Sequence, residues 1–178
     1  MKKVLLMACI LISFAVIILG CKAEKGDSGP TGPQGNANVK SKTVAVTSSN
    51  WVYSTSPNEF AVNITDGDIT QDIVDHGMVL VYMSNGSGAW IPLPIIGYTT
   101  GTSGGNTYDL EYKLSPVYGL SGVTIWYYVV TDPFVWIPAN PGSQTFKIIT
   151  VASLAKASVA QVDLNNYEKV KNALHLED

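Results

Sequence analysis

A cluster of aspartates is the densest group of potential metal ligands in the sequence: Asp66, Asp68, Asp72 and Asp75. Asp66-Gly67-Asp68 is a short run of hard oxygen donors, and calcium binds about six to eight oxygens. The spacing lacks the third ligand and the bidentate glutamate of a helix–loop–helix calcium site. The alternative is that Asp66 is a turn residue and Asp68 a helix cap. Asp66 and Asp68 are thus a candidate calcium site, and we expect no other metal and no cofactor.

General acid–base chemistry has few candidate residues in this chain. Histidine is the commonest general base, and the sequence holds only His76 and His175. His175 lies close to the carboxyl terminus, and His76 precedes Gly77, where an imidazole would meet the exposed carbonyls of a helix end. We find no nucleophile elbow, phosphate-binding loop or zinc-protease helix in the sequence. The sequence therefore predicts no catalytic residue and a protein that is not an enzyme.

Tryptophans offer a second kind of chemistry, because an exposed indole ring can stack on a sugar. Trp126 lies inside a dense apolar run and is expected in the core. Trp90 follows the turn at 85–88, and Trp136 lies in a loop bounded by prolines, so both are expected at one end of the fold. They are candidate ligand-binding residues. The alternative is that Trp136 is buried, since large aromatic rings are more often core than binding platform.

The amino terminus has the composition of an export signal. Two lysines precede an apolar run over residues 4–19, which ends at Gly20-Cys21. Ile18-Leu19-Gly20-Cys21 resembles the lipobox of bacterial lipoproteins. The resemblance implies a signal peptide over 1–20, cleavage after Gly20, a thioether-linked diacylglycerol on Cys21 and acylation of the new amino terminus. An uncleaved anchor is the alternative, although a membrane-spanning helix needs about 20 apolar residues.

A lipid on Cys21 would fix the location of the protein. We expect a cell-envelope protein attached to the membrane through its lipidated amino terminus at 21–25. Lys22, rather than an aspartate, follows the cysteine and favours the outer membrane by analogy with lipoprotein sorting. Cys9 would leave with the signal, so the mature fold contains no disulfide. The chain is acidic overall and contains no arginine, which argues against nucleic-acid binding.

Glycine occupies every third position over residues 26–37, with proline after it in two of the triplets. This is the composition of collagen, and so short a stretch is expected to form an extended spacer. A trimeric stalk is the alternative.

A β-rich domain is predicted over residues 38–178. Residues 108–114 alternate apolar with polar side chains, which indicates a half-buried strand, and 59–64 behave alike. The runs at 78–83, 122–130 and 145–151 are rich in β-branched and aromatic residues and are expected to be buried on both faces or near the core centre. Further strands are expected at 39–46, 51–53 and 90–98, the last restricted by its prolines to an edge or a bulged path. Seven to nine short strands predict an antiparallel β-sandwich.

Two helices are expected within this domain. A short internal helix is predicted within 68–77, capped by Asp68 and ended by Gly77. A C-terminal helix is predicted over 163–174, with Asp163 as its cap. An apolar stripe would lay this helix against the sandwich: Leu164, Tyr167, Val170 and Leu174.

A lipobox, a few collagen triplets and a β-rich domain together are similar to the collagen-like lipoproteins common among Bacteroidota. The segments 69–82, 146–151 and 162–174 resemble stretches of that group. The resemblance implies placement in the cell envelope and supplies no catalytic residue. The predicted function is a non-enzymatic structural or interaction role. The alternative is a glycan- or calcium-dependent adhesion module with a surface glycan or a protein as partner.

Overall fold

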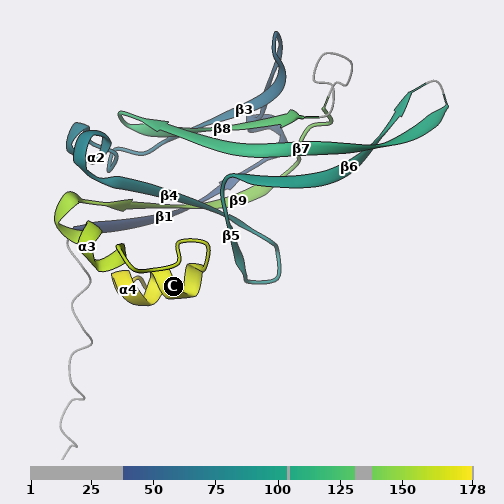
Figure 1. The fold of residues 1–178 in the computed structure, drawn as a ribbon. Coiled ribbons are helices and arrows are strands. Elements are labelled where there is room, and N and C mark those ends of the chain that lie inside the picture. Colours follow the sequence, from purple (N-terminus) through teal and green to yellow (C-terminus); the bar gives the residue numbers. More distant parts are fainter. Residues whose placement is uncertain (1–37, 104, 131–137, 178) are drawn as a thin grey trace, which may run out of the picture. The chain divides into compact units, whose positions relative to one another are not determined.

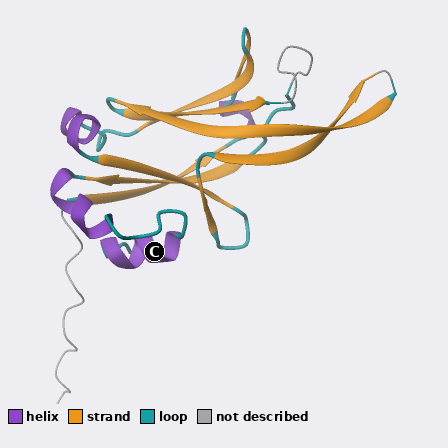
Figure 2. Cartoon of the chain, viewed as in Figure 1, coloured by secondary structure: helices purple, strands orange, loops and turns teal. Residues whose placement is uncertain are grey.

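The computed structural model describes residues 38–103, 105–130 and 138–177 (Figure 1). Two antiparallel β-sheets pack face to face, and short helices lie at one end and against one sheet (Figures 1 and 2). The predicted mainly-β sandwich with an internal and a C-terminal helix is confirmed. Cys21, the glycine-repeat segment and Trp136 lie outside the described residues. Across the part of the chain that is described, no helix is both long and apolar enough to traverse a bilayer.

Nine strands form the two sheets of the described residues. Sheet A has the order β1 (Val39–Val46), β9 (Gln144–Val151), β4 (Met78–Ser84) and β5 (Trp90–Pro92). Sheet B has the order β2 (Val52–Thr55), β3 (Asn58–Thr65), β8 (Gly122–Val129), β7 (Asn106–Gly119) and β6 (Ile95–Ser103). β7 pairs with β8 only from Tyr112 onward, so its first part forms a two-stranded ribbon with β6 (Figure 1).

The main core lies between the two sheets. β8 contributes every second side chain to it: Val123, Ile125, Tyr127 and Val129 are buried. The residues between them, Trp126 among them, are only half-buried and face away from the core. The prediction that Trp126 is a core residue is therefore wrong. The 122–130 segment was expected to be buried on both faces or near the core centre. β8 buries one face in the core, and its other face is half-buried because nothing described covers the outer side of sheet B.

β9 is buried on both faces, as its apolar run predicts. Phe146 and Ile148 enter the core between the sheets, whereas Ile149 and Val151 belong to a second apolar cluster. That second cluster is closed by the C-terminal segment on the outer side of sheet A (Figure 1). The segment comprises η2 (Ser153–Ala155), α3 (Lys156–Val159) and α4 (Tyr167–Leu174).

The C-terminal helix starts later than the sequence predicts. α4 begins at Tyr167, and its cap is Asn166, whose side chain accepts the Lys169 amide. Asp163 instead forms a turn, because its carboxylate accepts the Asn165 amide and its carbonyl accepts the Asn166 amide. Two capping residues thus compete within a few positions, and the later one starts the helix. Three residues of the predicted apolar stripe are buried on α4: Tyr167, Val170 and Leu174. Leu164 precedes the helix and is half-buried.

The internal helix α2 (Gln71–His76) is capped by Thr70, whose hydroxyl accepts the Ile73 amide. The predicted Asp68 cap is therefore wrong. Gly77 does end the helix, but with an ordinary negative φ. Glycine is required there for space, because a Cβ would lie 2.7 Å from the carbonyl oxygen of Val151 on β9.

The strand predicted over 90–98 is two strands. Pro92 and Pro94 lack the amide that a continuous ladder needs, and the pairing stops between them. β5 lies at the edge of sheet A, and β6 lies at the edge of sheet B. The prolines therefore mark the crossing from one sheet to the other.

Candidate functional site

The aspartate cluster forms a structural turn in this fold. Asp66 is 3 % exposed, and its carboxylate accepts the backbone amide of Asp68 at 3.1 Å. The Asp66 amide donates to Ser121 in the β7–β8 turn, which ties the two loops together. Within the described ranges, no group of three or more His, Cys, Asp or Glu side chains is placed to hold a metal ion. The contacts of Asp66 and Asp68 are those of a turn, and calcium binding by these two residues stays a hypothesis.

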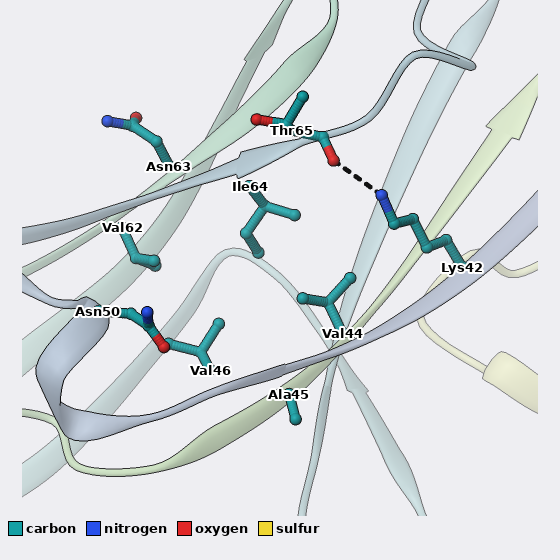
Figure 3. A pocket seen from close by; sticks show the side chains of 9 residues that line it. All are labelled: Lys42, Val44, Ala45, Val46, Asn50, Val62, Asn63, Ile64 and Thr65. Atoms are coloured by element: carbon teal, nitrogen blue, oxygen red, sulfur yellow. Dashed lines mark hydrogen bonds between the residues drawn. The ribbon is translucent and has the colours of Figure 1, made fainter.

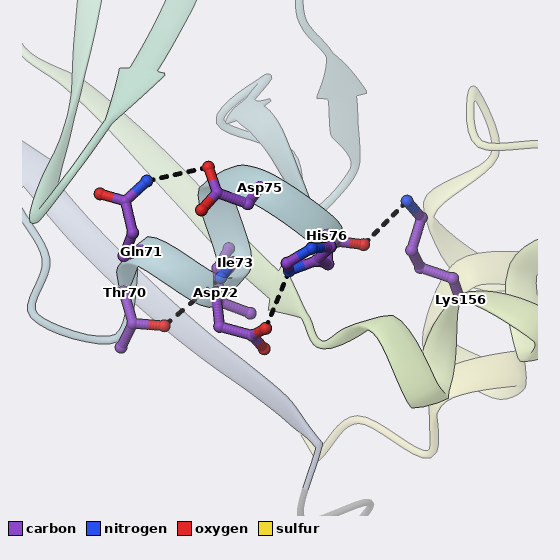
Figure 4. Close-up of polar contacts among 7 residues, drawn as sticks. All are labelled: Thr70, Gln71, Asp72, Ile73, Asp75, His76 and Lys156. Carbon is purple, nitrogen blue, oxygen red and sulfur yellow. Dashed lines mark hydrogen bonds and ion pairs between the residues drawn. The ribbon is translucent and has the colours of Figure 1, made fainter.

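The remaining acids of this segment and His76 lie on the surface of α2 (Figure 4). Nδ1 of His76 lies 3.1 Å from a carboxylate oxygen of Asp72, one helical turn earlier, and both side chains are about two-thirds exposed. Asp75 accepts a hydrogen bond from Gln71 at 2.8 Å. Lys156 of α3 donates to the backbone carbonyl of His76 (Figure 4). His76 therefore lies on the surface at the helix end as predicted, but its ring contacts the Asp72 carboxylate, and it is Lys156 that bonds a helix-end carbonyl.

Trp90 lies against the C-terminal helix. Its ring centre is 5.9 Å from that of Tyr167 on α4, and the ring is half-buried. Between the two rings lies the ammonium of Lys147, 4.7 Å from the Trp90 centre and 4.8 Å from the Tyr167 centre. Nζ of Lys147 also donates to the Tyr167 hydroxyl at 2.7 Å. The Trp90 ring therefore has an internal cation against it, and with Trp136 outside the described residues their predicted proximity stays a prediction.

Lys147 is 6 % exposed although it carries a charged group. Two aromatic faces and a hydroxyl oxygen stabilise the ammonium in place of water. Tyr82 completes this cluster, since its ring packs edge-on against Tyr167 and its hydroxyl donates to the Leu164 carbonyl. Burial, then the neighbouring Tyr167 and Asp163, raises the pKa of Tyr82 to about 12. Sequence reasoning missed this cluster, because Lys147 is a single charge in an apolar strand.

A groove of about 260 Å³ lies between β1 and β3, where the sandwich is open at its side (Figure 3). Val44 and Val46 from β1 face Val62 and Ile64 from β3 across it. Lys42 closes one end by donating to the Thr65 carbonyl at 2.8 Å. Three of these four apolar side chains are already buried in the core. The groove is consequently a shallow seam with little apolar surface left to offer a ligand.

The outer face of sheet B carries aromatic side chains: Trp126 and Tyr128 are half-buried, and Tyr98 is 77 % exposed. Two cross-strand rows of this face, given by the strand registers, hold the rings of β8, and a further row contains Asn63, Thr124 and Val117. One row is Val52, Ala61, Trp126 and Ser115. The next row is Ser54, Glu59, Tyr128, Lys113 and Ile96. No helix or strand among the described residues covers this face (Figure 1).

Polar side chains lie beside the aromatic rings of this face. Glu59 and Lys113 flank Tyr128 on the neighbouring strands, and both are only half-buried. Partial burial raises the pKa of the Glu59 carboxyl. At the next position along the sheet, the Thr124 hydroxyl donates to the Asn63 side-chain oxygen at 2.7 Å. The face thus combines stacking surfaces with hydrogen-bonding groups.

Comparison of the chain with protein-family models, with curated proteins and with solved structures finds no match.

Proposed function

We propose that this protein is a lipid-anchored cell-envelope protein, located at the outer membrane, with a non-enzymatic interaction role. The lipobox-like Ile18-Leu19-Gly20-Cys21 supports the anchor. The observation that carries the interaction role is the outer face of sheet B. Sheet A is covered by the C-terminal segment, while sheet B presents Trp126 and Tyr128 on a face that no described element covers.

The contacts of three titratable groups support a structural role for these side chains. Asp66 holds a turn, Asp72 pairs with His76, and Lys147 holds α4 against sheet A. Each of these groups is engaged with other parts of the fold in a way that stabilises an element boundary or a layer. The fold thus serves as a scaffold that presents a surface.

The anchor is tested by substituting Cys21. We expect Cys21→Ser to block incorporation of labelled fatty acid, to leave the precursor uncleaved, and to release the protein from the lipid-modified fraction. Cys9→Ser, within the predicted signal, is the matched control and should be labelled and cleaved like the wild type. Equal labelling of the two variants would show that Cys21 is not the lipidated residue.

The interaction role is tested with a photo-reactive side chain placed on either side of the domain in intact cells. Val117 is 57 % exposed on the outer face of sheet B, and Leu154 is 81 % exposed in the C-terminal segment. We expect cross-links to an envelope component from position 117 and none from position 154. Equal yields from the two positions, or none from either, would contradict a role for the outer face.

A further inference from the structure

We infer that the outer face of sheet B binds a neutral, extended polysaccharide, with Trp126 and Tyr128 stacking on sugar rings along one chain. This inference rests on the proposed interaction role and names its partner. Both residues lie on β8 and are two positions apart, so they project from the same face with a spacing of about 7 Å. Two half-buried rings in a line along one strand form a track suited to an extended chain.

The neighbours of Trp126 leave room for a sugar against its ring. Ala61 lies beside it on β3 and Ser115 lies beside it on β7. Both have short side chains, so nothing in this row projects as far as the indole. A pyranose has apolar C–H faces and can lie against an aromatic ring, which buries apolar area on both.

The neighbours of Tyr128 supply hydrogen bonds. The Glu59 carboxylate accepts and the Lys113 ammonium donates, from opposite sides of the ring. Sugar hydroxyls at the edge of a pyranose do both, so they can satisfy the two groups together. One negative and one positive side chain leave this row without net charge, and this balance matches a neutral glycan better than an acidic one.

A protein partner fits this face less well. The centre of a protein–protein interface is depleted of charged residues. Here Glu59 and Lys113 lie beside the central Tyr128. The exposed apolar residues of this face lie toward its margins: Val52, Ile96, Tyr98 and Val117. The mixture of isolated rings and polar groups favours a sugar chain.

The test is co-sedimentation of the full-length lipidated protein, in detergent micelles, with insoluble cellulose and with chitin. We expect the wild type to sediment with at least one of them, and Trp126→Ala to weaken this binding by about tenfold or more. Tyr108→Ala is the matched control, because Tyr108 is exposed on the same strand face as the buried Leu110, opposite to the Trp126 row. It should bind like the wild type.

A second variant guards against a folding defect in Trp126→Ala. Ala61→Gln keeps the indole and adds a longer side chain next to it on an already accessible face, so it should fold and still lose binding. Wild-type binding to neither polysaccharide, or undiminished binding by both variants, would overturn the inference. Retention on a polygalacturonate gel at least as strong as on the neutral polysaccharides would overturn it as well, as would cross-links from position 117 that contain only protein.

The two proposals fail in different ways. If Cys21 is lipidated and position 117 cross-links to a protein while no polysaccharide is bound, the interaction role stands and the glycan is wrong. If position 117 cross-links to nothing, the interaction role itself fails.

Discussion

Tyr167→Phe should destabilise the fold by more than the removal of one oxygen atom suggests. The hydroxyl accepts a hydrogen bond at 2.7 Å from the ammonium of Lys147, which is 6 % exposed. The phenyl ring that remains still packs against Tyr82 and Trp90, so little apolar contact is lost. A hydrogen bond to a charged group contributes about 1.5–3 kcal/mol. We expect the free energy of unfolding to fall by about that amount, because a buried ammonium is left with aromatic faces alone.

Lys147→Met tests the contribution of the hydrogen bond apart from that of side-chain packing. Methionine keeps most of the length of the lysine chain and removes the charge, and replacing a buried charge by an apolar group of similar volume is often neutral or stabilising. We expect this variant to lie within about 1 kcal/mol of the wild type. In the Lys147→Met background, Tyr167→Phe should then cost less than about 1 kcal/mol, since no ammonium needs the hydroxyl. The cycle predicts a coupling energy of about 0.5 kcal/mol or more.

Urea denaturation of the four proteins, followed by tryptophan fluorescence at one ionic strength, measures these differences by linear extrapolation. All four should share one m-value, because none of the changes alters the surface exposed on unfolding. If Tyr167→Phe costs the same with and without the lysine, the hydroxyl does not stabilise the ammonium and the reasoning fails.

Three further predictions concern the same fold. The pKa of Tyr82 is raised from 10.0 to about 12, so its neutral form contributes stability that is present below pH 10 and is lost as the pH rises toward 12. This stability amounts to about 2–3 kcal/mol. Because phenylalanine does not ionise, the stability of Tyr82→Phe in melts at alkaline pH should depend less on pH than that of the wild type. Gly77→Ala should cost about 2 kcal/mol or more in denaturant melts, because its methyl group meets backbone, whereas Gly67→Ala, with nothing within 4 Å, should be near neutral. Thr70→Ala should cost about 0.5–2 kcal/mol as the loss of a helix cap, and a similar loss from Asp68→Ala in the same melts would contradict the observed cap.

The strand pattern was largely predictable from local sequence, because side chains alternate across a sheet whatever the partner strand is. β7 has this alternation, and the continuous run of β9 indicates burial on both faces. For β8 the local sequence pattern predicts too much burial. Trp126 and Tyr128 are favourable strand residues and count as apolar, so their run resembles a strand buried on both faces. Whether the second face is covered depends on where α4 packs, and α4 packs on sheet A.

Helix starts were misplaced for a common physical reason. Asp68 precedes Thr70, and Asp163 precedes Asn166, so each helix has two residues able to cap it. Aspartate side chains also accept backbone amides two residues on, which stabilises a turn instead of a helix start. Both aspartates lie in such turns, with Asp68 donating its amide to the Asp66 carboxylate and Asp163 accepting that of Asn165. Capping residues a few positions apart differ little in capping free energy, so the sequence alone does not predict which one starts the helix.

The Lys147 cluster was beyond sequence reasoning, because its parts come from β4, β5, β9 and α4. The cluster also affects which of the two sheets is accessible. The ammonium holds Tyr167, and Tyr167 with Val170 and Leu174 seals the outer face of sheet A. A sandwich with one sheet sealed by its own C-terminal segment leaves the other sheet as the accessible one. The position of α4 therefore decides that the rings of β8, rather than Trp90, lie on the sheet face that no described element covers.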